Sequence, residues 1–218
     1  MRDVPELNIE KATAHRSQFK EYTDRVYQYD KNFADEDNGK LNVLVLGNSF
    51  ARDMVNILLE SDYRDKINIS YSNKVNSADT LIPRIKKSDY IFFFGWKHKL
   101  AEFVMANKKD SAQIWGIGTK NFGSSIGPIY KNRHKPDYFA QTRKIDPNFY
   151  VINDMLKAEW GDNYVDLLSV IENPDKKVRI FTDEHKLLSQ DCRHLTRAGA
   201  VFYARQVDFD NIFGGKDN

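Results

Sequence analysis

The sequence is poor in several features that mark particular classes of protein. It contains a single cysteine, Cys192, among 218 residues, which excludes an internal disulfide and a cysteine-rich metal site. The longest apolar run, 91–96, is too short to cross a bilayer, and no apolar core of a signal peptide follows the first residues. The formal net charge is only +2, which does not indicate a nucleic acid as the partner. We therefore expect a soluble protein that does not bind nucleic acid.

The composition is that of an ordinary globular protein, with 41% hydrophobic and 29% charged residues. The chain is long enough to bury the core of one domain, and it contains no internal repeat or low-complexity linker. We assign residues 41–214 to this domain and residues 1–40 to an N-terminal helical extension that packs on its core. The extension is predicted to be helical over 9–33, because large apolar side chains recur there every three or four positions.

Short apolar stretches alternate with helical stretches along the predicted domain. Five stretches have the composition of buried strands: 42–46, 67–71, 89–94, 113–117 and 164–168. Helical spacing is found at 51–60, 78–87, 100–107, 147–160 and 197–207. This alternation predicts an α/β fold with a mostly parallel sheet of about five strands, covered by helices on both faces. The longest irregular stretch, 119–146, is expected to lie over the sheet edge where active sites gather.

Ser49 follows the first predicted strand, which ends at Gly47. Ligands of open α/β folds bind at the carboxyl ends of the strands. A serine that begins the next helix lies close to backbone N–H groups that favour a developing oxyanion. A serine in this position is also a common helix N-cap with no chemical role. The residues around Ser49 alone therefore do not distinguish a nucleophile from a helix cap.

Asp191 and His194 stand three residues apart, just before the helix predicted at 197–207. In a turn, the carboxylate accepts a hydrogen bond from one imidazole nitrogen and leaves the other free to take a proton from Ser49. The alternative is that Asp191 caps a turn and His194 is a structural histidine. Together the two strings supply nucleophile, base and orienting acid, so a serine esterase or acyltransferase is our leading interpretation. The other histidines lack an equally placed acid: His15, His98, His134 and His185.

Both strings also carry a resemblance to a known family. Gly-Asn-Ser at 47–49 and Asp-x-x-His-Leu-Thr-x-x-Gly-Ala at 191–200 resemble the first and last signature blocks of the SGNH (GDSL-type) hydrolase superfamily. More narrowly, the chain resembles the SGNH domains fused to membrane acyltransferases that O-acetylate bacterial surface polysaccharides. Gly-Thr-Lys-Asn-Phe-Gly at 118–123 adds to this similarity. The resemblance covers about residues 40–210.

The resemblance implies a fold, a triad and a reaction. The fold is a three-layer αβα, flavodoxin-like sandwich, and the triad is Ser49, His194 and Asp191. The reaction is transfer of an acyl group, usually acetyl, to or from a carbohydrate hydroxyl through an acyl-Ser49 intermediate. This chemistry needs no metal or organic cofactor. The resemblance also implies a carbohydrate or polysaccharide acceptor, a membrane acyltransferase domain or partner, and an extracytoplasmic location on the periplasmic or cell-surface side.

The chain departs from the superfamily at the residues that assist the triad. The first block normally carries Asp where this chain has Asn48, and the middle blocks normally supply an oxyanion-hole Gly and Asn. Lys97 stands where that Asn would fall. A weakened oxyanion hole predicts slow hydrolysis, as suits a transferase that must keep its acyl-enzyme from water. The candidate oxyanion or substrate-binding residues are Asn48, Asn73, Trp96 and Asn121.

Other functions remain open at this point. The same fold and residues are compatible with a carbohydrate esterase, or with a catalytically silent glycan-binding domain. A nucleotide-binding flavodoxin-like domain ranks last, because residues 47–52 have one glycine and a bulky Phe50 where a phosphate-binding loop is needed. The basic stretch 131–135 either attracts an anionic polysaccharide or is simply the solvated face of a loop.

Overall fold

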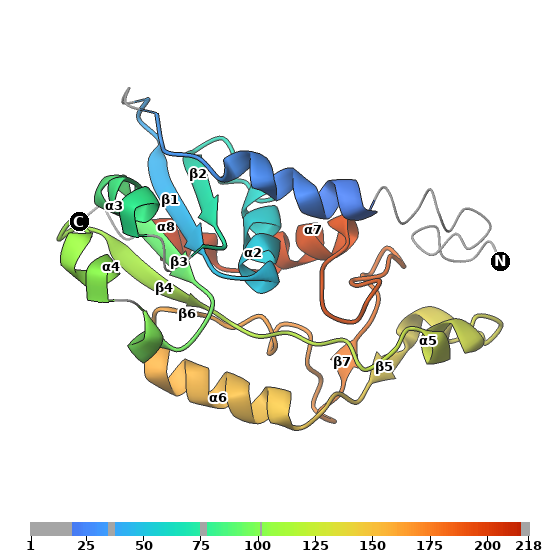
Figure 1. Cartoon of the computed structure of the whole chain (residues 1–218). Coiled ribbons are helices and arrows are strands. Elements are labelled where there is room, and N and C mark those ends of the chain that lie inside the picture. The colour runs from blue at the N-terminus through green and yellow to red at the C-terminus, as the bar shows by residue number, and fades with distance from the viewer. Residues whose placement is uncertain (1–18, 35–37, 75–77, 101, 215–218) are drawn as a thin grey trace.

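The centre of the protein is a five-stranded parallel sheet with strand order β2-β1-β3-β4-β6 (Figure 1). The computed structural model describes residues 19–34, 38–74, 78–100 and 102–214. The strands are β1 (Leu41–Leu46), β2 (Ile67–Ser72), β3 (Tyr90–Phe93), β4 (Gln113–Ile117) and β6 (Tyr164–Val165). Two short antiparallel strands, β5 (Thr142–Arg143) and β7 (Val178–Arg179), form a second sheet. The order of the main sheet is that of flavodoxin-like doubly wound folds, as predicted.

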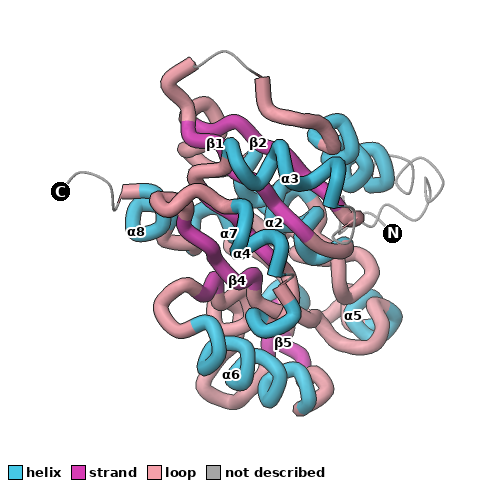
Figure 2. Tube along the Cα trace, turned by 60° about the vertical axis from the view of Figure 1, so that its left-hand side comes forward, coloured by secondary structure: helices cyan, strands magenta, loops and turns pink. Residues whose placement is uncertain are grey.

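Helices cover both faces of the main sheet, so the predicted three-layer architecture is confirmed (Figures 1 and 2). The helices are α2 (Ser49–Leu59), α3 (Ala78–Lys87), α4 (Glu102–Asn107), α5 (Gly127–Lys131), α6 (Asn148–Trp160), α7 (Arg197–Gln206) and α8 (Phe209–Phe213). In Figure 1, α2 and α7 lie on one side of the strands, and α4 and α6 lie on the other. Within the described part of the chain, no helix has both the length and the apolar character needed to cross a membrane.

The alternation of side chains along β1 explains why the sheet is buried on both faces. Val43 and Val45 belong to the core shared with α2 and α7, whereas Leu44 and Leu46 belong to the core shared with α3 and α6. All four side chains are fully buried. Burying each of them stabilises the fold by about 1.5–3 kcal/mol relative to leaving it in water. A strand buried on both faces is therefore a continuous apolar run.

The predicted elements differ from the structure mainly at their ends. Helix α2 begins at Ser49, two residues before the predicted start, because the Asn48 side chain caps it. Strand β6 is only two residues long, since the chain turns at Asp166, whose carboxylate accepts bonds from the backbone and hydroxyl of Ser169. The stretch 119–146 was expected to be irregular but contains α5, β5 and the 3-10 helix η5 (Tyr138–Ala140).

The N-terminal part of the described chain packs on the core. Residues 19–24 are α-helical and continue as the 3-10 helix η3 (Arg25–Tyr29), whose Val26 is fully buried. The Arg25 guanidinium lies 2.8 Å from the Glu60 carboxylate at the end of α2. Residues 9–18 of the predicted helix lie outside the described residues. The division of the chain at residue 40 stays a prediction.

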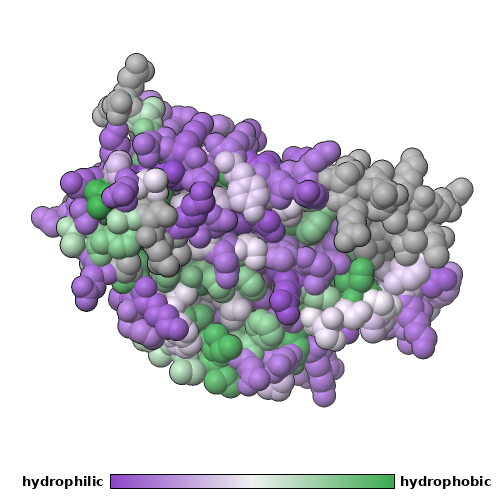
Figure 3. Space-filling model, in the orientation of Figure 1, coloured by the Kyte–Doolittle hydropathy of each residue, from purple (hydrophilic) through white to green (hydrophobic). Residues whose placement is uncertain are grey.

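One helix carries an apolar outer face. Val151, Ile152 and Met155 of α6 are between 41% and 55% exposed. In Figure 3 apolar side chains gather over α6 at the lower edge of the view. These side chains lie on the face of α6 that is turned away from the sheet, so they do not belong to either core.

Gly199 of α7 packs so closely on the chain before it that a side chain there is expected to destabilise the protein. A Cβ at this position would overlap the Leu188 carbonyl oxygen, which is backbone and cannot move aside. Gly199→Ala is therefore expected to lower the free energy of unfolding by about 1–3 kcal/mol, measured by urea denaturation. Gly127→Ala is the matched control, because its nearest neighbour would be the Ser125 hydroxyl at 3.5 Å. Equal midpoints for the two variants would contradict this account.

Candidate active site

Asp191 and His194 form a hydrogen-bonded acid–base pair in the turn before α7. The Asp191 Oδ2 atom lies 2.5 Å from Nδ1 of His194, and Oδ1 accepts from the backbone N–H groups of Arg193 and His194. Partial burial acts to raise the pKa of Asp191, but these hydrogen bonds outweigh it and hold the pKa well below its ordinary value. The carboxylate is therefore charged and orients the imidazole, as predicted for this pair.

The turn that carries the pair has an unusual backbone. Cys192 has φ +67°, in the left-handed region that residues other than glycine seldom adopt. Its side chain is buried, and its carbonyl oxygen accepts a hydrogen bond of 3.0 Å from the Phe122 N–H. This bond ties the turn to the segment that follows β4. Among the described residues, no hydrogen bond uses Nε2 of His194, which leaves that nitrogen free to take a proton.

Ser49 is the first residue of α2, at the carboxyl end of β1. The N-cap is Asn48, whose side-chain oxygen accepts a hydrogen bond of 3.0 Å from the Phe50 N–H. The alternative in which Ser49 itself caps the helix is therefore wrong. Gly47 allows the tight turn before the cap, with φ +133° and the Phe94 and Ala51 side chains packed against it. The partly exposed Ser49 hydroxyl has no capping role here.

Helix α2 and the His194 turn are held together by Asp53. Its Oδ2 atom accepts a hydrogen bond of 3.3 Å from the Leu195 N–H. Ser49 and Asp53 stand four residues apart, so they lie on the same face of the helix, one turn from each other. The face of α2 that carries Ser49 is thus turned toward the His194 turn. Among the described residues, no hydrogen bond joins the Ser49 hydroxyl to the His194 ring, so their direct contact stays a prediction.

A buried ion pair lies beneath these residues. The Lys120 ammonium lies 2.7 Å from Oδ2 of Asp53, and both side chains are fully buried. It also lies 4.2 Å from the centre of the Phe50 ring. Burial raises the pKa of Asp53, and the Lys120 charge opposes that rise. The pair connects α2, the segment after β4 and the turn before α7, three segments far apart in sequence.

The sequence carries one signal for this pair. Asp53 is the first carboxylate of α2, and every residue of this helix from Asp53 to Leu58 is buried. A charge in such a position needs a counter-charge nearby. Lys120 comes three residues after the end of β4, although its glycine-rich surroundings resemble an ordinary surface loop.

The four predicted assisting residues do not all meet at one place. Asn48 caps α2, and the buried Asn121 accepts a hydrogen bond of 2.7 Å from the Gly123 N–H, next to the segment that contacts Cys192. Asn73 lies exposed after β2, and Trp96 lies partly buried after β3. In the described parts of the chain, no hydrogen bond connects either Asn73 or Trp96 with Ser49 or His194.

A second histidine has an acid beside it, supplied by a residue distant in sequence. Nδ1 of His98 lies 2.6 Å from the Glu159 carboxylate, but the His98 side chain is 64% exposed. His15 lies outside the described residues. In the ranges that the structure describes, no group of three or more His, Cys, Asp and Glu side chains is arranged to hold a metal ion.

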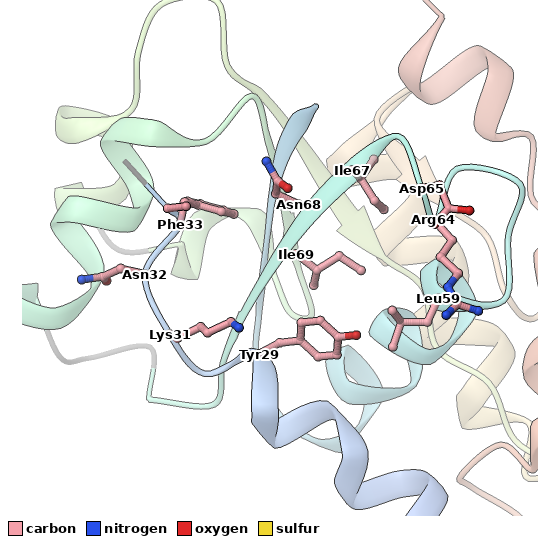
Figure 4. A pocket seen from close by; sticks show the side chains of 11 residues that line it. Tyr29, Lys31, Asn32, Phe33, Leu59, Arg64, Asp65, Ile67, Asn68 and Ile69 are labelled. Carbon is pink, nitrogen blue, oxygen red and sulfur yellow. The ribbon is translucent and has the colours of Figure 1, made fainter. Parts of the chain in front are cut away.

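One cavity of about 290 Å³ lies away from the candidate site (Figure 4). It is lined by Tyr29, by residues 31–34, by Leu59 at the end of α2, by Arg64 and Asp65, and by Ile67, Asn68 and Ile69. The last three are the first residues of β2, so the cavity lies at the amino edge of the parallel sheet. Ser49 lies at the opposite, carboxyl edge. The cavity therefore does not belong to the site built around Asp191 and His194.

Removing one member of the buried pair is expected to destabilise the protein strongly. Lys120→Met leaves the Asp53 carboxylate buried without a counter-charge and is expected to cost about 3–5 kcal/mol in urea denaturation. The double variant Lys120→Met/Asp53→Leu removes both charges and should recover most of that loss. Lys109→Met, which removes a partly exposed ion pair of 2.9 Å with Asp89, should cost less than about 1 kcal/mol. A double variant as unstable as the single one would contradict the electrostatic explanation.

The hydrogen bonds to Asp191 are expected to make stability depend on pH. Its folded-state pKa lies below the ordinary value of about 3.9, so the carboxylate stabilises the folded protein above that pH. This contribution is lost as the pH falls through the ordinary value toward the lower folded value. The difference in unfolding free energy between wild type and Asp191→Asn should therefore shrink between about pH 6 and pH 3. A difference that stays constant over this range would be the opposing result.

The fold has a counterpart among solved structures. No family model and no curated protein matches the chain. The chain is similar to the periplasmic domain of a lipopolysaccharide acetyltransferase from Salmonella ser. Paratyphi A, with a TM-score of 0.55 and 13% sequence identity. The match covers 91% of this chain and 95% of that domain. At this identity the similarity shows a common α/β fold over nearly the whole chain.

Proposed function

We propose that the chain transfers an acyl group, usually acetyl, to or from a carbohydrate hydroxyl through an acyl-Ser49 intermediate. The observation that carries the proposal is the Asp191–His194 pair, formed in a turn that Asp53 connects to the helix beginning with Ser49. The similar fold of a lipopolysaccharide acetyltransferase domain supports a polysaccharide as the acceptor. Together these observations favour the extracytoplasmic domain of a polysaccharide O-acetyltransferase of the SGNH type.

In this mechanism His194 takes the proton of the Ser49 hydroxyl as its oxygen attacks the acyl carbonyl. The tetrahedral intermediate collapses, the donor's leaving group receives that proton, and the acyl group remains on Ser49. A sugar hydroxyl then gives its proton to His194 and attacks the ester. The bond between the acyl carbon and Ser49 breaks, and His194 returns the proton to the Ser49 oxygen. Asp191 keeps the imidazole in the required tautomer throughout and stabilises its charged form.

The start of α2 is the proposed oxyanion site. The Phe50 N–H is already bound to Asn48, so the Ser49 N–H and the positive end of the helix supply the stabilisation. Asn121 is the assisting residue that the surroundings favour most. Its side-chain oxygen is held by Gly123, and its segment contacts the turn that carries the acid–base pair. Asn73 and Trp96 are proposed at most for binding of substrate further from the reacting atoms.

The proposed location and partner follow from the same comparison. The similar domain is periplasmic, which supports a periplasmic or cell-surface location for this chain. An acyl donor must reach Ser49 from outside this domain, and a membrane acyltransferase domain or partner is the proposed supplier.

Ser49→Ala is expected to abolish acylation while leaving the fold intact. After incubation with an activated acetyl ester, intact-protein mass spectrometry of the wild type should show one added acetyl group, located on Ser49. Ser49→Ala should lose this adduct and labelling by a fluorophosphonate probe, with transfer reduced by at least about 10³-fold. Ser111→Ala, which removes an exposed hydroxyl before β4, is the matched control and should behave as wild type.

The fate of the acyl group then separates the alternatives. Transfer to an added glycan supports the transferase, whereas release to water alone at ordinary esterase rates identifies a carbohydrate esterase. A folded wild type that neither labels nor acetylates would contradict the enzymatic proposal and leave a glycan-binding domain.

A further inference from the structure

The segment between β4 and α6, residues 119–146, holds a charge out of proportion to its length. It contains six lysines and arginines against two aspartates, whereas the whole chain has a net charge of only +2. In Figure 1 the segment leaves the carboxyl end of β4 and extends away from the main sheet to α5. Hydrophilic side chains cover its outer end in Figure 3.

Most of this charge is not neutralised within the protein. Lys120 is used inside the fold, where it pairs with Asp53. Among the described residues, none of the other five cations of the segment forms an ion pair: Lys131, Arg133, Lys135, Arg143 and Lys144. Lys131 and Lys135 are exposed on and after α5. Cations without a partner beside a reaction site attract anions and steer them to it.

Two guanidinium groups lie beside the turn that carries Asp191 and His194. Arg143 packs against Gly123 and donates a hydrogen bond of 2.5 Å to the Ser125 carbonyl. Gly123 directly follows Phe122, whose N–H binds the Cys192 carbonyl oxygen, so Arg143 lies near the turn. The exposed Arg193 belongs to the turn itself. In the described part of the chain, Arg193 also has no ion-pair partner. A guanidinium binds a carboxylate or phosphate through two parallel hydrogen bonds, so these groups suit an acidic ligand.

We propose that the acceptor is an anionic glycan, with carboxylate or phosphate groups close to the hydroxyl that is acylated. Arg143 and Arg193 bind the acidic group nearest to the reacting hydroxyl. Lys131 and Lys135 bind acidic groups further along the same polymer, which the extended segment 119–146 can follow. This inference rests on the proposed function and narrows its acceptor to an acidic class.

Binding without chemistry tests the inference independently of the reaction. Ser49→Ala protein is titrated with three fluorescent probes: oligogalacturonate for carboxylates, poly(glycerol phosphate) for phosphates, and neutral dextran of similar length. At least one acidic probe should bind about tenfold or more tightly than dextran, and its affinity should fall between about 50 and 300 mM salt. The tighter of the two acidic probes identifies the acidic group. Equal affinity for all three probes would overturn the proposal.

Charge-matched variants locate the binding surface. In the Ser49→Ala background, Arg143→Gln/Arg193→Gln and Lys131→Gln/Lys135→Gln should each weaken acidic-probe binding by about tenfold. Lys40→Gln/Lys86→Gln removes the same charge from exposed positions before β1 and at the end of α3, and should weaken it less than about twofold. Because Arg143 also donates a hydrogen bond to the Ser125 carbonyl, Arg143→Lys serves as a second variant. It keeps the charge but loses the two parallel hydrogen bonds, so it should weaken binding less than Arg143→Gln does. Equal losses in the control would instead indicate non-specific attraction.

Two further outcomes distinguish a failure of this inference from a failure of the proposed acyl-transfer function. If the protein binds an acidic probe selectively but its Ser49 is never acylated, the proposed anion-binding surface is supported and the proposed enzymatic function is contradicted. Binding to vesicles of phosphatidylglycerol, with no preference for either acidic glycan, would overturn the proposal in favour of a membrane surface.

Discussion

The candidate site depends on one electrostatic constraint, the burial of Asp53 and Lys120 together. Neither charge is tolerable in the core alone, so each must find the other when the chain folds. Asp53 also accepts the Leu195 N–H, and the segment of Lys120 contacts Cys192 two residues on, through Phe122. Helix α2, the segment after β4 and the turn that carries Asp191 and His194 therefore meet where a carboxylate and an ammonium group neutralise each other.

The sheet supplies the frame in which this constraint acts. Strands buried on both faces leave only their ends for chemistry, and the carboxyl edge is where β1 delivers Ser49 and β4 delivers Lys120. Asn48 completes the arrangement, because its side chain caps α2 and leaves the following hydroxyl uncommitted. A charged segment beyond this edge and an acid–base turn beside it form the two sides of the proposed acceptor site.

Much of the fold and part of the candidate site could be predicted from the sequence. The remaining features could not, and the causes are physical. The alternation of apolar runs and helical spacing predicted a mostly parallel sheet of about five strands, and the Asp-x-x-His string predicted the 191–194 pair, because both depend on neighbours in sequence. The flavodoxin-like topology was implied only by the family resemblance. Strands β5 and β7 have two residues each, too few to show a period. The Lys120–Asp53 and His98–Glu159 pairs join residues more than sixty positions apart, where no local pattern exists. The choice of Asn48 over Ser49 as the cap depends on backbone angles that one residue type does not determine.

The three proposed catalytic residues are held in place in two different ways, so denaturing conditions are not expected to displace all of them at once. Asp191 and His194 meet within a single turn, so their hydrogen bond needs little beyond that turn. Ser49 stands more than 140 positions earlier in the chain, and its helix α2 is joined to the turn by the hydrogen bond from the Leu195 N–H to Asp53. Mild heat or denaturant that loosens this packing would separate α2 from the turn while the hydrogen bond between Asp191 and His194 persists.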